Sequence, residues 1–134
     1  MNDFNLKTGM IGEASVIVND SNTALKFGSG TVNVYATPAM IGLMENASIN
    51  AVDRHLPEGY ATVGTKIEIK HMAATPIGMK VIANAEVIEI DCLKIKFKVE
   101  AFDEKEKIGE GTHNRYIVKL SDFLRKAESK AEDK

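Results

Sequence analysis

The sequence predicts one α+β domain in which a single long helix packs across an antiparallel sheet. Two observations lead to this prediction: a helical apolar pattern begins after Thr37-Pro38, and alternating strands fill most of the chain from residue 61 onward. Short turns separate those strands, so neighbouring strands must run antiparallel. A helix laid over the sheet would bury both apolar faces. With 134 residues, 44% of them hydrophobic, the chain suits one core and is too short for two domains.

The first third of the chain has the weakest signals. Residues 14–19 are expected to form a first strand, followed by a turn in the Asn-Asp-Ser-Asn segment at residues 19–22. Gly28-Ser29-Gly30 marks a flexible point. Residues 31–35 are a candidate short strand.

The long helix is expected to run from Pro38 to about His55. Thr37 would supply the N-cap hydroxyl, and Pro38 would sit at the first helical position, where no amide hydrogen is missed. Pro57 and Gly59 should stop the helix. The predicted core face consists of Met40, Met44, Ala47 and Ala51. The predicted solvent-facing side consists of Asn46, Asn50 and Asp53.

Four strands are expected in the rest of the domain, at residues 61–72, 79–90, 93–102 and 108–120. In the second of them the alternation slips near Val87-Ile88, which indicates a β-bulge. The sheet would therefore have about five to six strands.

The C-terminal end has a biased composition. Ser121 is expected to cap a short helix, and residues 125–134 are almost all charged residues and alanine. We expect the folded domain to span residues 1–124, and residues 125–134 to form a charged tail that is either a fraying helix end or disordered.

Composition excludes several classes of function. A net charge of −2 gives no basic field for nucleic acid or anionic membranes, and an aromatic content of 6% without Trp is low for base stacking. No apolar stretch approaches the roughly 20 residues of a membrane span, and the first twelve residues lack a signal-peptide pattern. The single cysteine, Cys92, excludes an internal disulfide, fits a reducing, cytoplasmic compartment, and is expected to be inert packing.

Glu45 is the first candidate for chemistry because it lies on the shoulder of the helix's apolar face. Its neighbours one turn away are Ile41 and Ile49. Burial there would raise the pKa of the carboxyl and suit it to act as a base or a nucleophile. A boundary glutamate that reaches water is the competing interpretation, and the pattern alone leaves both open.

His71 and Thr37 are the next candidates. His71 shares the inward face of its predicted strand with Ile67 and Ile69, so its imidazole needs partners for both nitrogens. A structural histidine would also fit this position. Thr37, as a cap, would lie beside free helix amides and a partial positive charge, which together can stabilise an oxyanion.

The last predicted strand contains the segment Gly-Glu-Gly-Thr-His-Asn-Arg at residues 109–115. Glycine in a strand often marks close approach of another backbone or a ligand. His113 and Arg115 share one side, interpreted for His113 as a polar strand face. The three histidines lack ligand spacing, so no metal site is expected.

Four segments together resemble a known family. They are residues 36–45 (Ala-Thr-Pro-Ala-Met-Ile-Gly-Leu-Met-Glu), residues 63–65 (Val-Gly-Thr), residues 71–78 (His-Met-Ala-Ala-Thr-Pro-Ile-Gly) and residues 108–115. The pattern is similar to that of the fluoroacetyl-CoA thioesterase branch of the hot-dog-fold thioesterases, and it extends from about Lys7 to Leu120. The resemblance implies a hot-dog fold, an acyl-CoA substrate, and a homodimer that joins two sheets with active sites at the interface.

The resemblance also implies a site. Catalytic roles would fall on Thr37, Glu45 and His71, which the residue patterns had already singled out. Glu45 would attack the carbonyl or activate water, Thr37 would position and polarise the site, and His71 would help the thiolate leave. The Gly64 amide would be the oxyanion donor and Arg115 a supporting residue. No cofactor is expected, since CoA is part of the substrate.

The family's fluoroacetyl-specific enzyme carries an aromatic lid before the helix. Residues 28–32 contain no aromatic residue here, and Tyr35 is the nearest, so a generic short acyl-CoA is the expected substrate. One alternative is a non-catalytic module that binds an acyl or CoA-like ligand, favoured if Glu45 is exposed or far from His71. A hot-dog dehydratase would need an Asp and a His close together in a loop before the helix, and we do not find them.

Overall fold

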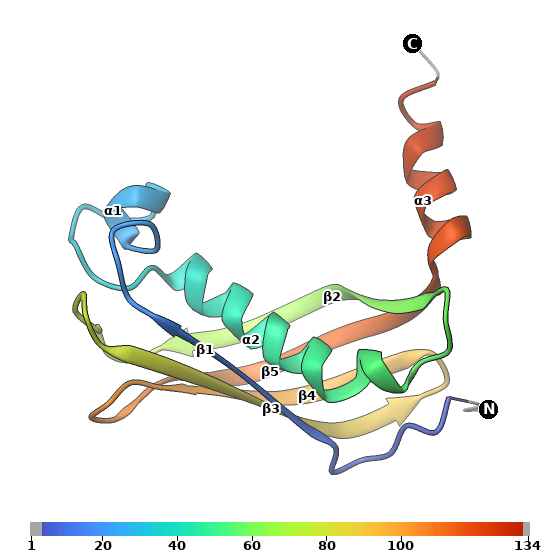
Figure 1. Cartoon of the computed structure of the whole chain (residues 1–134), viewed down its shortest axis with the longest axis horizontal. Coiled ribbons are helices and arrows are strands. Elements are labelled where there is room, and N and C mark those ends of the chain that lie inside the picture. The colour runs from blue at the N-terminus through green and yellow to red at the C-terminus, as the bar shows by residue number, and fades with distance from the viewer. Residues whose placement is uncertain (1–3, 133–134) are drawn as a thin grey trace.

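The computed structural model describes residues 4–132, which form one curved antiparallel sheet with a helix lying across it (Figure 1). The elements, in chain order, are β1 (Ile11–Ile17), α1 (Ala24–Phe27), α2 (Thr37–Val52), a 3₁₀ turn (Asp53–His55), β2 (Tyr60–His71), β3 (Lys80–Asp91), β4 (Lys94–Phe102), β5 (Lys107–Lys119) and α3 (Leu120–Ser129). The strand order is β1-β3-β4-β5-β2. The α+β architecture predicted from the sequence is confirmed.

Local patterns located the main elements closely. The four predicted strands after the helix match β2 to β5 within a residue or two, and the register of β3 against β4 shifts between Val87 and Glu89, where a bulge was predicted. The first strand begins earlier than predicted, at Ile11. The candidate strand at residues 31–35 is wrong, because only isolated bridges form there, from Tyr35 to Thr23 and from Val34 to Pro76.

Two predicted helix caps are also wrong. Ala36 holds the N-cap position of α2, and the hydroxyl of Thr37, the first helical residue, bonds to a side chain elsewhere. Likewise α3 begins at Leu120, after Lys119 in the cap position, and Ser121 lies inside it. In both cases a backbone turn starts the helix without a side-chain cap bond.

The core lies between α2 and the middle strands of the sheet. The predicted core face of α2 (Met40, Met44, Ala47 and Ala51) is buried. It faces the fully buried side chains of β4, which are Ile95, Phe97, Val99 and Ala101. Full burial of a large apolar side chain contributes about 2 kcal/mol, so these side chains help to hold the helix on the sheet.

Helix α2 covers one edge of the sheet and leaves the other open. Gly12 in β1 has no side chain because the backbone of α2 passes directly against it, at Ala47 and Ala51. Asn50 of α2 donates a hydrogen bond of 2.8 Å to the main-chain oxygen of Glu13 in β1. At the opposite edge, β2 pairs with β5 on one side only within residues 4–132. An unpaired strand of this length normally needs a partner or a cover.

No helix among the described residues is long and apolar enough to cross a membrane.

The close approach of β1 and α2 can be tested with Gly12→Ala. A Cβ there would collide with main-chain atoms of Ala47 and Ala51, which cannot move independently. We expect the free energy of unfolding to fall by about 3 kcal/mol, measured by urea denaturation.

Gly42→Ala is the matched control, because a Cβ at that exposed position of α2 meets nothing within 4 Å. It should raise stability by about 0.5–1 kcal/mol, as expected for replacing a helical glycine. Equal effects of the two substitutions would contradict the close-packing argument.

Candidate active site

The first feature of the candidate site is a threonine–histidine pair where α2 begins and β2 ends. The Oγ1 of Thr37 lies 2.7 Å from Nδ1 of His71, so a hydroxyl at the helix N-terminus bonds an imidazole at the strand end. Burial lowers the pKa of His71, with a hydrogen bond to the backbone of Ala73 opposing the shift, so the ring favours its neutral form. Its buried Nε2 has no partner within the described part of the chain. A buried nitrogen without a partner is expensive unless a ligand or water completes it.

A cavity of about 340 Å³ adjoins this pair. Its lining combines Thr37, His71 and Tyr35 with small and apolar side chains, among them Val32, Val34 and Met72. Small-molecule sites have this composition, with mainly apolar walls and a few polar groups that fix orientation. The cavity can therefore accept a small apolar group next to the imidazole.

Glu45 lies apart from this pair within one chain. Eight residues of α-helix separate it from Thr37, a rise of about 12 Å. Its Oε2 lies 3.9 Å from Nη1 of Arg115, and its side chain is 40% exposed. A Cβ at Gly64 would come within 2.9 Å of Oε2, so the absence of a side chain there makes room for the carboxylate.

A buried hydrogen-bond network holds Arg115 beside Glu45. The guanidinium donates from Nε to Oγ1 of Thr62 (2.7 Å) and from Nη2 to its main-chain oxygen (2.9 Å). Thr62 in turn donates to Asp53 from both its hydroxyl and its amide. Burial lowers the pKa of Arg115, and the carboxylates of Asp53 and Glu45 oppose that shift.

His113 completes the network. Its Nδ1 lies 2.8 Å from the main-chain oxygen of Lys66, and its Nε2 lies 3.1 Å from Nη1 of Arg115. A carbonyl can only accept and a guanidinium can only donate, so the neutral ring carries its proton on Nδ1 and accepts at Nε2. Burial lowers the pKa of His113, the main-chain oxygen of Lys66 opposes the shift, and the positive charge of Arg115 reinforces it.

Of the predicted site residues, the structure brings Thr37 together with His71, and Glu45 together with Gly64 and Arg115. Tyr35 lines the cavity beside Thr37 and His71 but is almost fully buried, and burial raises its pKa to about 12.

Three expectations about other residues are wrong. His113 is buried, not part of a polar strand face, because it shares the inward side of β5 with Gly109, Gly111 and Arg115. The alternation of residues 109, 111, 113 and 115 on one side of the strand was already visible in the sequence. Asp53 is partly buried because it accepts bonds from Thr62, and Cys92 is exposed in the turn between β3 and β4.

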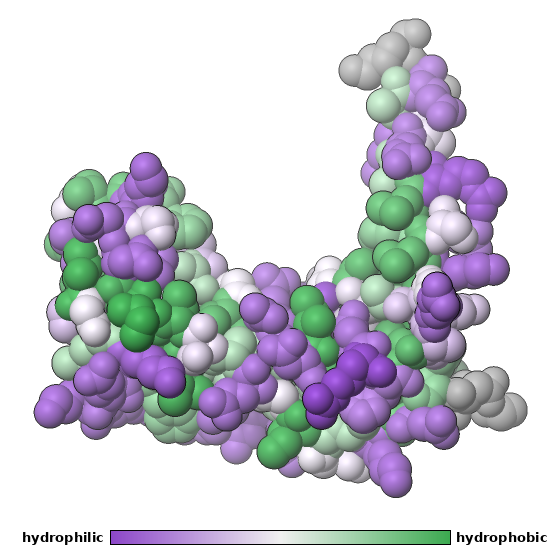
Figure 2. All heavy atoms as spheres, viewed as in Figure 1, coloured by the Kyte–Doolittle hydropathy of each residue, from purple (hydrophilic) through white to green (hydrophobic). Residues whose placement is uncertain are grey.

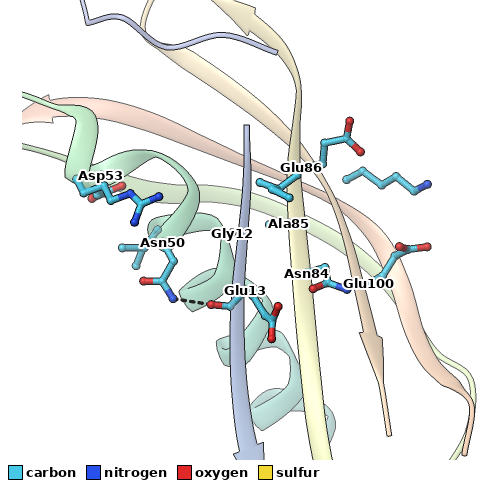
Figure 3. Close-up of a pocket in the computed structure, with 12 residues that line it drawn as sticks. Gly12, Glu13, Asn50, Asp53, Asn84, Ala85, Glu86 and Glu100 are labelled. Carbon is cyan, nitrogen blue, oxygen red and sulfur yellow. Dashed lines mark hydrogen bonds between the residues drawn. The ribbon is translucent and has the colours of Figure 1, made fainter. Parts of the chain in front are cut away.

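A larger cavity of about 660 Å³ lies on the other side of α2, around β1 (Figure 3). Asn50 and Asp53 approach it from the helix, and Asn84, Glu86 and Glu100 approach it from the sheet (Figure 3). Its lining includes neither Thr37, Glu45 nor His71. Residues 4–132 hold no group of three or more His, Cys, Asp or Glu side chains that could bind a metal ion.

Comparisons with known proteins agree with this geometry. The sequence profile of the fluoroacetyl-CoA-specific thioesterases matches residues 18–121. A fluoroacetyl-CoA thioesterase from Streptantibioticus cattleyicolor is 38% identical over 97 residues, which cover 72% of this chain and 70% of the relative. A threonine-to-serine mutant of a fluoroacetyl-CoA thioesterase, solved with acetyl-CoA, superposes with a TM-score of 0.88 at 30% identity, covering 93% of this chain and 98% of the other.

A thioesterase-superfamily protein from Thermus thermophilus superposes with a TM-score of 0.86 at 26% identity, covering 96% and 97% of the two chains. A helix over a curved five-stranded sheet, with polar residues at the helix start and along β2, is thus the architecture of a hot-dog thioesterase, an enzyme that hydrolyses thioesters. The chain belongs to the fluoroacetyl-CoA-specific thioesterase family, as the sequence motifs indicated.

The neutral state of His113 predicts how stability depends on pH. An unfolded histidine takes up a proton near pH 6.5, whereas the folded ring, facing Arg115, resists it. Below about pH 6.5 the unfolded state therefore binds more protons, and stability falls by up to about 1.4 kcal/mol per pH unit for each such histidine. His71, whose pKa is also lowered, acts in the same direction.

Urea denaturation between pH 7 and pH 5.5 measures this dependence. We expect His113→Asn to be less stable than the unsubstituted protein at pH 7 but to lose less stability as the pH falls. An unchanged slope in this variant would show that His113 is protonated in the folded protein.

Proposed function

We propose that this protein hydrolyses a short acyl-CoA to a carboxylate and free CoA. The observation that carries the proposal is the Thr37–His71 pair, with its unpartnered Nε2, at a small cavity with mainly apolar walls. The bond to Thr37 orients the imidazole, and the N-terminus of α2 adds a partial positive charge that favours a developing oxyanion.

The reaction needs one bond to form and one to break at the acyl carbon. Glu45 takes a proton from water, whose oxygen then attacks the carbonyl; direct attack by the carboxylate is the covalent variant of the same step. The oxyanion is stabilised by the amide of Gly64 and the start of α2. The C–S bond breaks, and the proton that Glu45 took from water passes to the departing thiolate, relayed by the neutral His71, so both side chains return to their starting protonation states.

Arg115 has a positioning role in this scheme. Its guanidinium is fixed by Thr62 and His113, so its remaining Nη1 hydrogen is directed toward the Glu45 side. A fixed positive charge there holds the carboxylate in place beside Gly64, where it can meet the substrate.

The site is proposed to be completed in a homodimer. In one chain, Glu45 lies two helical turns from Thr37, too far for both to act on one carbonyl. Glu45 and Gly64 lie beside the middle of β2, and His71 lies at its end, so both groups follow the strand whose outer edge is open. Antiparallel pairing of two β2 strands would bring Glu45 of one protomer to the Thr37–His71 pair of the other.

The cavity size and lining favour a short acyl group, and residues 28–32 offer no aromatic side chain to select a fluorinated one. CoA would enter only as part of the substrate, and the chemistry requires no metal or organic cofactor. We place the protein in the cytoplasm, where acyl-CoA is found and a lone thiol stays reduced, with neither nucleic acid nor a membrane as partner. The separation of Glu45 from His71 in one chain also fits a non-catalytic acyl-CoA-binding module, and activity measurements decide between the two.

Thiol release from acyl-CoAs of increasing chain length tests the proposal directly. We expect turnover of short acyl-CoAs, and a loss of two or more orders of magnitude in kcat for Glu45→Ala with folding intact. Asn46→Ala, on the adjacent exposed position of α2, should retain full activity. Binding of acyl-CoA without turnover by the unsubstituted protein would instead establish the binding module.

Mixed dimers test where the two halves of the site meet. Thr37→Ala and Glu45→Ala protomers should each be inactive alone. Co-expressed, they should recover about a quarter of normal activity, because half of the dimers are mixed and each mixed dimer holds one intact composite site. Dimers of one unsubstituted and one double-mutant protomer are the control. They would hold no intact composite site, so the sample should show only the activity of the unsubstituted homodimers that it contains. Activity well above that level would place Glu45 and Thr37 of one chain in the same site.

A further inference from the structure

Helix α3 carries an apolar face that no part of residues 4–132 covers. It stands away from the sheet, on the side occupied by α2 (Figure 1). Leu120, Phe123 and Leu124 are 37%, 41% and 50% exposed, and with Ala127 they follow the spacing of one helical face. Figure 2 shows hydrophobic side chains gathered on the lower half of α3, beside the hollow above α2. Helices of this length are marginal in water without packing, so this face needs a partner.

A second exposed apolar patch lies at the other end of the molecule. Leu25, Phe27 and Val32 are 58%, 50% and 57% exposed, in and after α1, and Met72, directly after β2, is also exposed. Figure 1 shows α1 raised on the same side of the sheet as α2 and α3. Val32 and Met72 also line the cavity beside Thr37 and His71, so this patch extends to the wall of that cavity.

Strand β2 connects the two patches geometrically. The amide of Leu120 donates to the main-chain oxygen of Gly59 (2.8 Å), so α3 is anchored just before β2 begins. The α1 patch lies where β2 ends. In an antiparallel two-fold pair of β2 strands, the start of one strand lies beside the end of the other. Both patches stand on the same side of the sheet, so α3 of one protomer would stand next to the α1 patch of its partner.

We propose that α3 of one protomer docks on the α1 patch of a second copy and closes that copy's acyl cavity. The inference rests on the dimer of the proposed function and adds the residues that finish its substrate pocket. Phe123 and Leu124 are the pocket-closing residues, and Phe123 supplies the aromatic side chain that residues 28–32 lack. The acyl chain length accepted by one cavity is then set partly by the other chain.

Site-directed cross-linking tests the docking. Cys92 is first replaced by Asn, which removes the single thiol and tolerates the positive φ of 56° at that position. In this background we make Phe27→Cys, Leu124→Cys and their mixture, and add a short bismaleimide. The mixture should give a cross-linked dimer that joins residue 27 of one chain to residue 124 of the other, identified by mass spectrometry. Each single variant should give little, because two-fold symmetry places the two α3 helices at opposite ends of the sheet.

Each outcome separates this inference from the proposed function. Efficient cross-linking of Leu124→Cys to itself would show that α3 pairs with α3 and would overturn the docking. A dimer with thioesterase activity but no link between residues 27 and 124 would also overturn it and leave the proposed function standing. An active monomer would remove the dimer and, with it, the docking.

Kinetics give a second readout that a merely structural helix would not produce. Phe123→Ala should raise KM several-fold for the preferred short acyl-CoA and relax the preference toward longer chains, with a smaller effect on kcat. Lys126→Ala, an exposed position of α3 outside the apolar face, should leave both constants unchanged. An unaltered chain-length profile in Phe123→Ala would exclude a role for α3 in closing the cavity.

Discussion

The buried guanidinium of Arg115 is the interaction on which the rest of the site depends. It lies on β5, bonds Thr62 on β2 and faces Glu45 on α2, so one side chain ties two neighbouring strands to the helix. A buried charge is costly unless its hydrogens are bonded and its charge is compensated. Thr62, His113 and the two carboxylates meet those requirements. The position of Glu45 is therefore linked to the register of β2 against β5, in which Gly64 pairs with Arg115.

The same register explains the glycines on the inward side of β5. Gly109 makes room for Met40 of α2, and at Gly111 any Cβ would collide with the backbone of β2. Two positions further along, His113 and Arg115 point the same way and fill the space with polar groups. The inward face of β5 thus changes along the strand from glycines to polar side chains. Met40 of α2 packs against Gly109, and Glu45 lies beside Arg115.

Periodicity alone located most of the fold. The core face of α2, the inward residues of β4 and the bulge in β3 depend on neighbours three, four or two residues away, and they were predicted correctly. Two of the errors involve partners outside the local pattern. Thr37 was expected to cap its helix, but its hydroxyl instead forms a hydrogen bond with His71, 34 residues later in the sequence. Asp53 was placed on the solvent-facing side because its partner, Thr62, lies beyond the turn that ends the helix.

The candidate site shows a similar division. Sequence patterns proposed Thr37, Glu45 and His71 one at a time, and only the family resemblance joined them into one site. How they group within one chain depends on which ends of α2 and β2 meet, which local patterns do not contain. One chain provides a polarised histidine beside an acyl-sized cavity, and a carboxylate held by an arginine about 12 Å further along the helix. Water activation and leaving-group protonation must both occur at one carbonyl. Within residues 4–132 the two groups lie apart and the outer edge of β2 between them is unpaired, which is the arrangement that the proposed homodimer would complete.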